Sequence, residues 1–329
     1  NYNTVVGDEA GTAITTGDGN VAVGFEALKT EDAHGRNTAM GYQALKTLNA
    51  GAEGVTTTIG YQAGTSLTTG VQNTLIGGLS GDALTDADYN VAVGNNTLSS
   101  DTKGSKSIAI GYEALVSQNF STSTDSFNVA MGFQAGAAVT TGIQNTLIGG
   151  LAGDAITTAN YNVAVGYNAA GSSTTGHSNS VLGRHALKNN TTGSNNVAIG
   201  RDALEANTTA DDNTAVGFHA LVTNTTGASN TSVGKFSLRY NTTGARNVAV
   251  GTSALTAHTT GADNVGVGES ALSLNTTASN NTALGSAALQ ANTTGASNTA
   301  VGRAALNANT TAANNTAVGY FALVTNTTG

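Results

Sequence analysis

Hydrophobic and polar residues alternate over a short stretch that recurs along the whole chain. Each stretch ends in a glycine, as in Asn-Thr-Ala-Val-Gly, and we call this glycine the anchor and count the other positions of a repeat from it. Of the eighteen spacings between the nineteen anchors, sixteen are 17 residues and the other two are 19 and 21. The anchors are Gly7, Gly24, Gly41, Gly60, Gly77, Gly94, Gly111, Gly132, Gly149, Gly166, Gly183, Gly200, Gly217, Gly234, Gly251, Gly268, Gly285, Gly302 and Gly319.

The residues at one position in successive repeats form a column, and four columns before the anchor predict a strand. Position −1 is Val, Ile, Leu or Met in all nineteen repeats, and position −3 is Thr, Val or Ile in eighteen, with Ser180 as the exception. Position −2 is mostly Ala, and position −4 is Asn in seventeen repeats. Large β-branched residues that alternate with small ones are typical of a short strand. The anchor then permits a bend that a Cβ atom would obstruct.

The residues after the anchor distinguish two main kinds of repeat, which differ at position +4. Thirteen repeats have Leu at position +4, and eight of these continue into a polar Asn-Thr-Thr turn, which Gly follows in five. Five repeats have Gly at +4 and a large apolar residue at +7 instead: Ile14, Leu67, Leu84, Val139 and Ile156. This compensation indicates a packed interior, because the loss of a buried Leu costs about 2–5 kcal/mol.

A 17-residue unit with one strand and glycine corners is too short for known helical repeats, which need about 33 residues or more. We therefore expect an all-β protein, a parallel β-solenoid or β-roll of about nineteen coils, as a single array over residues 1–329. The Asn column at −4 would form an amide ladder between coils. The two longer coils predict protruding loops near residues 46–58 and 116–127. Caps, attachment domain and tip are expected to lie outside this sequence.

The expected core is thin, with three large apolar side chains per coil: the two in the strand and the Leu or its substitute. The Ala columns at −2 and +3 are small enough for another chain to approach closely. We therefore predict a homotrimer of parallel rods.

The repeats NTAVGFHALVTNTTGASN and NTAVGYFALVTNTTG resemble the arrays of phage tail-fibre and tail-fibre-like proteins. The strand cores NVAVG and NVAIG are also similar to the head repeats of trimeric autotransporter adhesins of the YadA type, although those adhesins use a shorter coil of about 14 residues. The resemblance implies a trimeric parallel β-roll that contacts a cell surface.

Composition removes several classes of chemistry. The chain has 43 Gly but no Pro and no Cys, so disulfides, Cys-ligated zinc and thiol nucleophiles are absent. A net charge of −8 with 12 dispersed Lys and Arg argues against nucleic-acid binding. Apolar runs are too short to insert in a membrane.

No group of residues predicts catalysis, a cofactor or a metal. Five histidines, His34, His177, His185, His219 and His258, are expected to be solvated, and His185 and His219 lie two coils, about 9–10 Å, apart. Asp82 and Asp154 lack the nine-residue calcium period. The acids Glu26, Glu113, Asp202 and Glu269 are scattered one to a coil.

The column at +1 is more diverse than the columns of the strand, and it would contact glycans or a protein receptor if it is exposed. Its aromatic and cationic members are Phe25, Tyr42, Tyr61, Tyr112, Phe133, Tyr167, Arg184, Arg201, Phe218, Lys235, Arg303 and Tyr320. The alternative is that corner residues vary because nothing constrains them. No receptor-binding residue is assigned.

The sequence thus favours a non-enzymatic, extracellular structural or adhesive fibre: the shaft of a phage tail fibre on a virion, joined at its ends to other virion or envelope components. The alternative is the head of a bacterial surface adhesin. Ice binding is disfavoured because the Thr column at −3 is expected to be buried, and a polysaccharide-cleaving β-helix enzyme is the remaining alternative.

Overall fold

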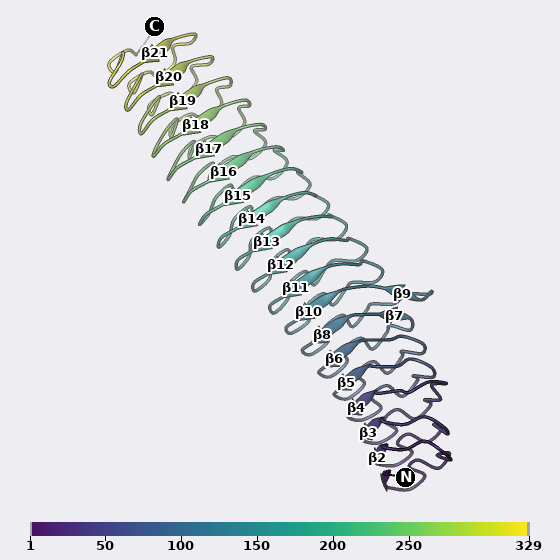
Figure 1. Ribbon diagram of the computed structural model, residues 1–329. Helices are drawn as coiled ribbons and strands as arrows, with labels where there is room; N and C mark the ends of the chain where they lie inside the picture. Colours follow the sequence, from purple (N-terminus) through teal and green to yellow (C-terminus); the bar gives the residue numbers. More distant parts are fainter. Residues whose placement is uncertain (1, 328–329) are drawn as a thin grey trace. The chain divides into compact units, whose positions relative to one another are not determined.

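The computed structural model describes residues 2–327 and confirms an all-β parallel solenoid (Figure 1). There is no helix in this range, hence none that could span a membrane. The chain divides into two compact units, Asn1–Asn162 and Val163–Gly329, each a stack of coils. The single array over residues 1–329 stays a prediction, and residues 1, 328 and 329 lie outside the described range.

Each coil has one three-residue strand at positions −3 to −1. In the first unit the strands are β1 Thr4–Val6, β2 Val21–Val23, β3 Thr38–Met40, β4 Thr57–Ile59, β5 Thr74–Ile76, β6 Val91–Val93, β8 Ile108–Ile110, β10 Val129–Met131 and β11 Thr146–Ile148. In the second unit they are β12 Val163–Val165, β13 Ser180–Leu182, β14 Val197–Ile199, β15 Thr214–Val216, β16 Thr231–Val233, β17 Val248–Val250, β18 Val265–Val267, β19 Thr282–Leu284, β20 Thr299–Val301 and β21 Thr316–Val318.

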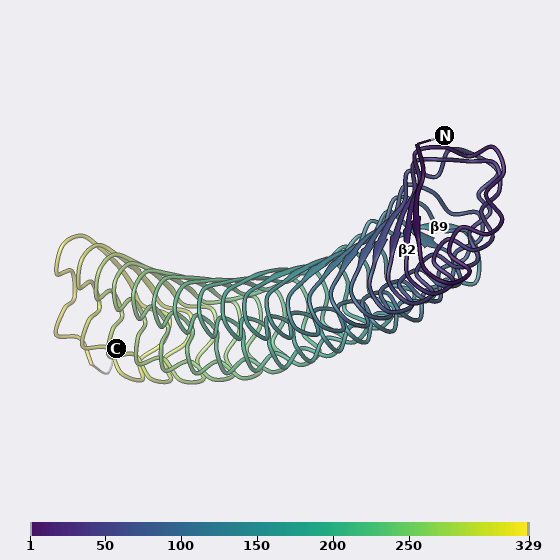
Figure 2. The same ribbon diagram turned by 90° about the horizontal axis from the view of Figure 1, so that it is seen from below.

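Within each unit, successive strands pair in parallel and in register, so every column lies along one line of the stack (Figure 2). In β15 and β16, for example, Thr214 pairs with Thr231 and Val216 with Val233. The strands form one wall of the coils, and the rest of each coil closes the interior.

The prediction of which strand residues are buried was wrong. The residue at −2, mostly Ala, is buried in every strand except β1, whereas none of the nineteen large residues at −1 is buried. Leu182 at −1 is 51% exposed, while Ala198 at −2 in the next coil is fully buried. The Thr column at −3 is also partly exposed rather than buried, so two columns of large residues lie on the outer surface of the wall.

The Ala columns therefore line the interior, and they cannot be where a second chain approaches. The coil is so narrow that opposing walls meet over Ala at −2 and +3, with Leu at +4 filling the remaining space. Where Gly replaces this Leu, the predicted compensation is confirmed in four of five coils, since Leu67, Leu84, Val139 and Ile156 are fully buried, whereas Ile14 in the first coil is partly exposed. Leu75 at −2 helps to fill the same gap, because its methyl groups lie where a Cβ atom of Gly64 or Gly81 would be.

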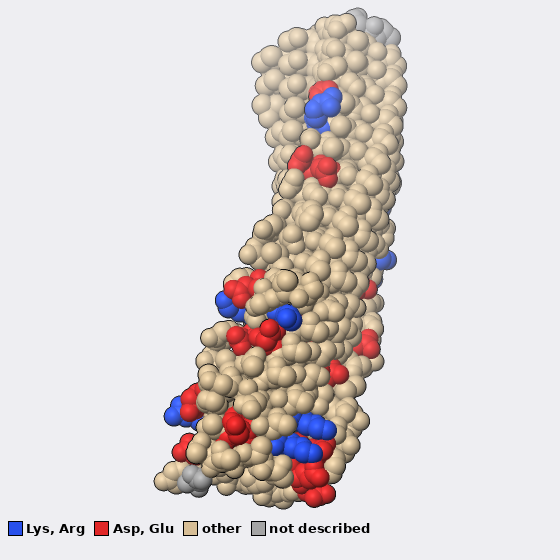
Figure 3. Space-filling view, turned by 90° about the vertical axis from the view of Figure 1, so that its right-hand side faces the viewer, with Lys and Arg blue, Asp and Glu red and all other residues tan. Residues whose placement is uncertain are grey.

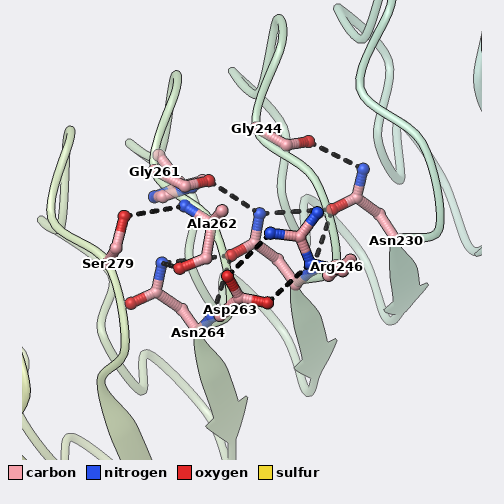
Figure 4. A network of polar contacts seen from close by, with 10 residues as sticks. Asn230, Gly244, Arg246, Gly261, Ala262, Asp263, Asn264 and Ser279 are labelled. Atoms are coloured by element: carbon pink, nitrogen blue, oxygen red, sulfur yellow. Dashed lines mark hydrogen bonds and ion pairs between the residues drawn. The ribbon is translucent and has the colours of Figure 1, made fainter.

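The Asn column at −4 is buried and joins the coils, as predicted, but mostly through the backbone (Figure 4). Asn264 accepts on Oδ1 from the backbone N–H of Asn281 at 3.0 Å, and its own Nδ2 donates to the carbonyl oxygen of Ala278 at 2.8 Å. Asn230 donates likewise to Gly244 at 2.8 Å (Figure 4). The amide side chain thus ties the strand to the opposite corner of the next coil.

Three positions per coil, +2, +4 and +12, have left-handed backbone, which the sequence did not predict. In one coil these are Asp202, Leu204 and Asp212, with φ of 56°, 54° and 61°. Each donates its N–H to an adjacent coil: Asp202 to Arg184 at 3.0 Å, Leu204 to Ala220 at 3.0 Å and Asp212 to Ser194 at 3.2 Å. These bonds offset a conformation that is unfavourable for residues with a side chain.

The anchor glycines are required by both backbone angle and space. Gly268 has φ of 130°, and a Cβ atom there would lie 2.6 Å from the carbonyl oxygen of Gly285 in the next coil. Gly266 in the same coil lies at −2, with ordinary backbone and its closest neighbours at 3.3 Å. Position 268 therefore requires glycine, whereas position 266 has the backbone conformation and nearly the space for a methyl group.

We expect Gly268→Ala to destabilise the protein by roughly 2 kcal/mol or more, since it combines backbone strain with a clash. The matched control Gly266→Ala restores the Ala of its column and should change stability by less than about 1 kcal/mol. Urea unfolding followed by circular dichroism compares the two. Equal losses of stability in both variants would contradict this account of the anchor.

Candidate functional site

Residues 2–327 have no pocket, and the candidate functional features lie on the outer surface of the coils. Charged side chains form small separate groups on the face that Figure 3 shows. Three kinds of surface feature remain: the longer coils, the column at +1 and the titratable groups at +2.

In the two longer coils, where protruding loops were predicted near 46–58 and 116–127, the exposed residues are 49, 51–53 and 55 in the first and 119, 121–123, 125 and 127 in the second. In the second loop, β9 (Thr124–Asp125) pairs in parallel with β7 (Gly104–Ser105) of the preceding coil, on the side away from the strand wall (Figure 1).

Each longer coil is held by a buried carboxylate at +7 of the coil before it. Glu31 accepts N–H bonds from His34 at 3.1 Å and Ala50 at 3.2 Å. Asp101 accepts from Gly104 at 3.0 Å and Phe120 at 3.2 Å. Both acids are fully buried, so they serve the fold by accepting from one N–H group of their own coil and one of the longer coil that follows.

Most residues of the +1 column are exposed, although Phe218 is only partly so, and several of its aromatic rings stack from coil to coil. The ring centroids of Phe25 and Tyr42 are 5.3 Å apart, those of Tyr42 and Tyr61 are 5.5 Å apart, and those of Tyr112 and Phe133 are 5.5 Å apart. These side chains are between 38% and 55% exposed. These rings are therefore constrained by contact with their neighbours, in contrast to the alternative that corner residues vary because nothing constrains them. A receptor role for these residues stays a prediction.

The +2 column holds polar ladders beside these rings. Gln62 donates to Gln43 at 2.8 Å, and Gln43 donates to Glu26 at 2.7 Å. Hydrogen bonds from Lys29 and Lys46 hold the pKa of Glu26 at about 2, so this carboxylate stays charged. Glu113 similarly accepts from Gln134 at 2.7 Å, which lowers its pKa. Glu269 is exposed.

Asp82 and Asp154 do not form a joint site, since they lie four coils, roughly 19 Å, apart within the first unit. In each, one carboxylate oxygen is buried and has no hydrogen-bond partner. Partial burial raises the pKa of both carboxyl groups.

The second unit brings together four groups that the sequence left apart. Asp202 lies in the coil between His185 and His219, and its Oδ1 is 3.5 Å from His185 Nδ1 while its Oδ2 is 3.1 Å from His219 Nε2. Glu205 of the same coil also contributes a carboxylate oxygen. In the sequence, this cluster could have been found from the +2 column, where His185, Asp202 and His219 occupy three consecutive coils.

The prediction that all five histidines are solvated was wrong for His258, which is fully buried. It occupies a second Asn ladder, at +7, in which Asn207 donates to the Oδ1 of Asn190 at 2.8 Å. His258 Nε2 donates to the carbonyl oxygen of Gly261 at 2.8 Å, so Nδ1 accepts from Asn275 at 3.1 Å. Asn241 Oδ1 is left buried without a donor.

His258 is neutral in this arrangement, and burial lowers its pKa below the ordinary 6.5. In the unfolded chain the imidazole titrates near its ordinary value, so between the two values only the unfolded chain binds the proton. Stability is therefore expected to fall as the pH drops below about 6.5, and to stop falling from this cause below the folded pKa.

His258→Asn should remove this dependence and restore the donor to Asn241, with a gain of about 1 kcal/mol at neutral pH. Urea midpoints at pH 8 and pH 5 test both effects, because other titrating groups are common to wild type and variant. An identical pH dependence in the two proteins would contradict the assignment.

Comparisons with known proteins do not assign this chain to a family. No protein-family model matches it, and no curated protein matches it at a significant level. Its function must therefore be argued from the surface.

Proposed function

We propose that the chain forms the shaft of an extracellular adhesive fibre, a phage tail fibre, as a homotrimer of parallel copies. The observation that carries this proposal is the outer face of the strand wall. In each coil a large apolar residue at −1 and a Thr, Val or similar residue at −3 are at least partly exposed, throughout both units.

Such a face is unusual for an isolated soluble chain. Continuous exposed apolar surface on a protein generally marks a site of association. Met40, Ile59, Ile148 and Ile199 at −1 are each 36–40% exposed.

The partner that best fits this face is a second copy. A parallel copy has the same strand spacing of about 4.8 Å and the same columns, so its large side chains meet an equivalent set at every coil. A third copy completes a closed assembly, as the resemblance to trimeric fibres implies.

The exposed +1 rings and the loop tips at residues 51–53 and 121–123 are the surfaces through which the fibre would contact a glycan or protein receptor. Several weak contacts on one stiff assembly act together, so overall binding exceeds that of any single contact.

A charge in the apolar face should break the assembly. We expect the wild-type chain to sediment at three times the mass of one chain, and Val216→Asp with Val250→Asp to sediment as a monomer, because a carboxylate cannot be buried unpaired. The control is Thr209→Asp with Thr226→Asp, at exposed corners. A monomeric wild type would overturn the trimer.

Ice binding is the second candidate, because the Thr column at −3 faces outward. Thr214 and Thr231 are partly exposed and lie opposite each other in adjacent strands. This use needs the face to be free, so it requires a monomer that produces thermal hysteresis at micromolar concentration. A trimer without thermal hysteresis would rule it out.

A further inference from the structure

We propose that His185, Asp202 and Glu205 bind a divalent transition-metal ion, such as Zn²⁺ or Co²⁺, on the surface of the second unit. The three side chains come from two adjacent coils, and one ligand atom of each lies within 4.8 Å of the others. This site goes beyond the proposed shaft function and does not depend on it.

The distances suit metal coordination. Zinc ligands of this kind lie about 2.0–2.2 Å from the ion, so two ligands of one ion are roughly 3–3.6 Å apart. His185 Nδ1 and Asp202 Oδ1 are 3.5 Å apart. The Glu205 side chain is partly exposed, so its carboxylate can turn toward the ion to complete the set.

The surroundings already orient the central carboxylate. Asp202 Oδ2 accepts from Arg201 Nε at 2.9 Å and lies 3.1 Å from His219 Nε2, while Oδ1 faces His185. The Asp202 side chain is only 8% exposed. Fixed partners on the oxygen that does not bind the ion are the usual support of a metal-binding carboxylate. The ring of His185 is in turn placed against Tyr167, with centroids 5.8 Å apart.

The ligand types select the class of ion. An imidazole nitrogen with two carboxylates suits Zn²⁺, Co²⁺ or Ni²⁺ better than Ca²⁺ or Mg²⁺, which prefer all-oxygen sites. Asp202 and Glu205 together outweigh the single positive charge of Arg201, so the site keeps a net negative charge. Three protein ligands leave positions for water, as in open metal sites.

A second cluster in the first unit provides a comparison. Glu31, Asp32 and His34 also have ligand atoms within 4.8 Å of one another. Both oxygens of Glu31, however, accept backbone N–H groups of His34 and Ala50, so this carboxylate is committed to the longer coil. His34 is therefore a matched control for His185.

The test is isothermal titration of the full, tag-free chain with ZnCl₂ at pH 7.5, together with the visible absorption of bound Co²⁺. We expect one ion per chain in wild type, and at least a tenfold loss of affinity in His185→Ala and in Glu205→Gln. His34→Ala should bind as wild type does. Circular dichroism checks that each variant is folded.

Two results would overturn the proposal. One is wild-type protein that binds no Zn²⁺ up to millimolar concentration. The other is binding that survives His185→Ala and Glu205→Gln but is lost in His34→Ala, which would place the ion in the first unit.

Discussion

Backbone hydrogen bonding between stacked coils is the constraint on which the rest of the molecule depends. It acts around the whole coil: the strand, the left-handed positions at +2, +4 and +12, and the corner at +8 all bond to a neighbouring coil, as Thr208 does to Thr225. Proline has no N–H to donate, and its absence from the chain fits this demand. The close approach of consecutive anchors likewise permits only glycine, as at Gly217 beside Gly234.

The period, the strand and the anchor could be predicted from the sequence because each repeats nineteen times. Which face of the strand is buried could not, since a three-residue strand shows alternation without saying which side is inside. Residue size suggested the wrong side, because the narrow coil holds mostly Ala at −2, and Leu75 and Leu147 fit there beside glycines at +4. The left-handed backbone of Leu204 could not be predicted either, because hydrogen bonding between stacked coils overrides the right-handed preference of Leu.

The surface features were predictable only in part. The diverse +1 column was identified, but the stacking of Tyr42 on its neighbours depends on register. The +7 column contains the signals that were missed. His258 stands there in place of Asn, and Glu31 and Asp101 stand there in the coils that precede the two longer coils. The cluster around Asp202 was missed because the two histidines were compared without the coil between them.

The central claim is that the large strand residues face outward and meet another copy. The chain has no Cys, so single cysteines at Val250 and at the adjacent Ala249 report on this directly. With a short bis-maleimide cross-linker under native conditions, we predict covalent chain-to-chain products for Val250→Cys and none for Ala249→Cys. Cross-linking through Ala249→Cys but not Val250→Cys would contradict the account.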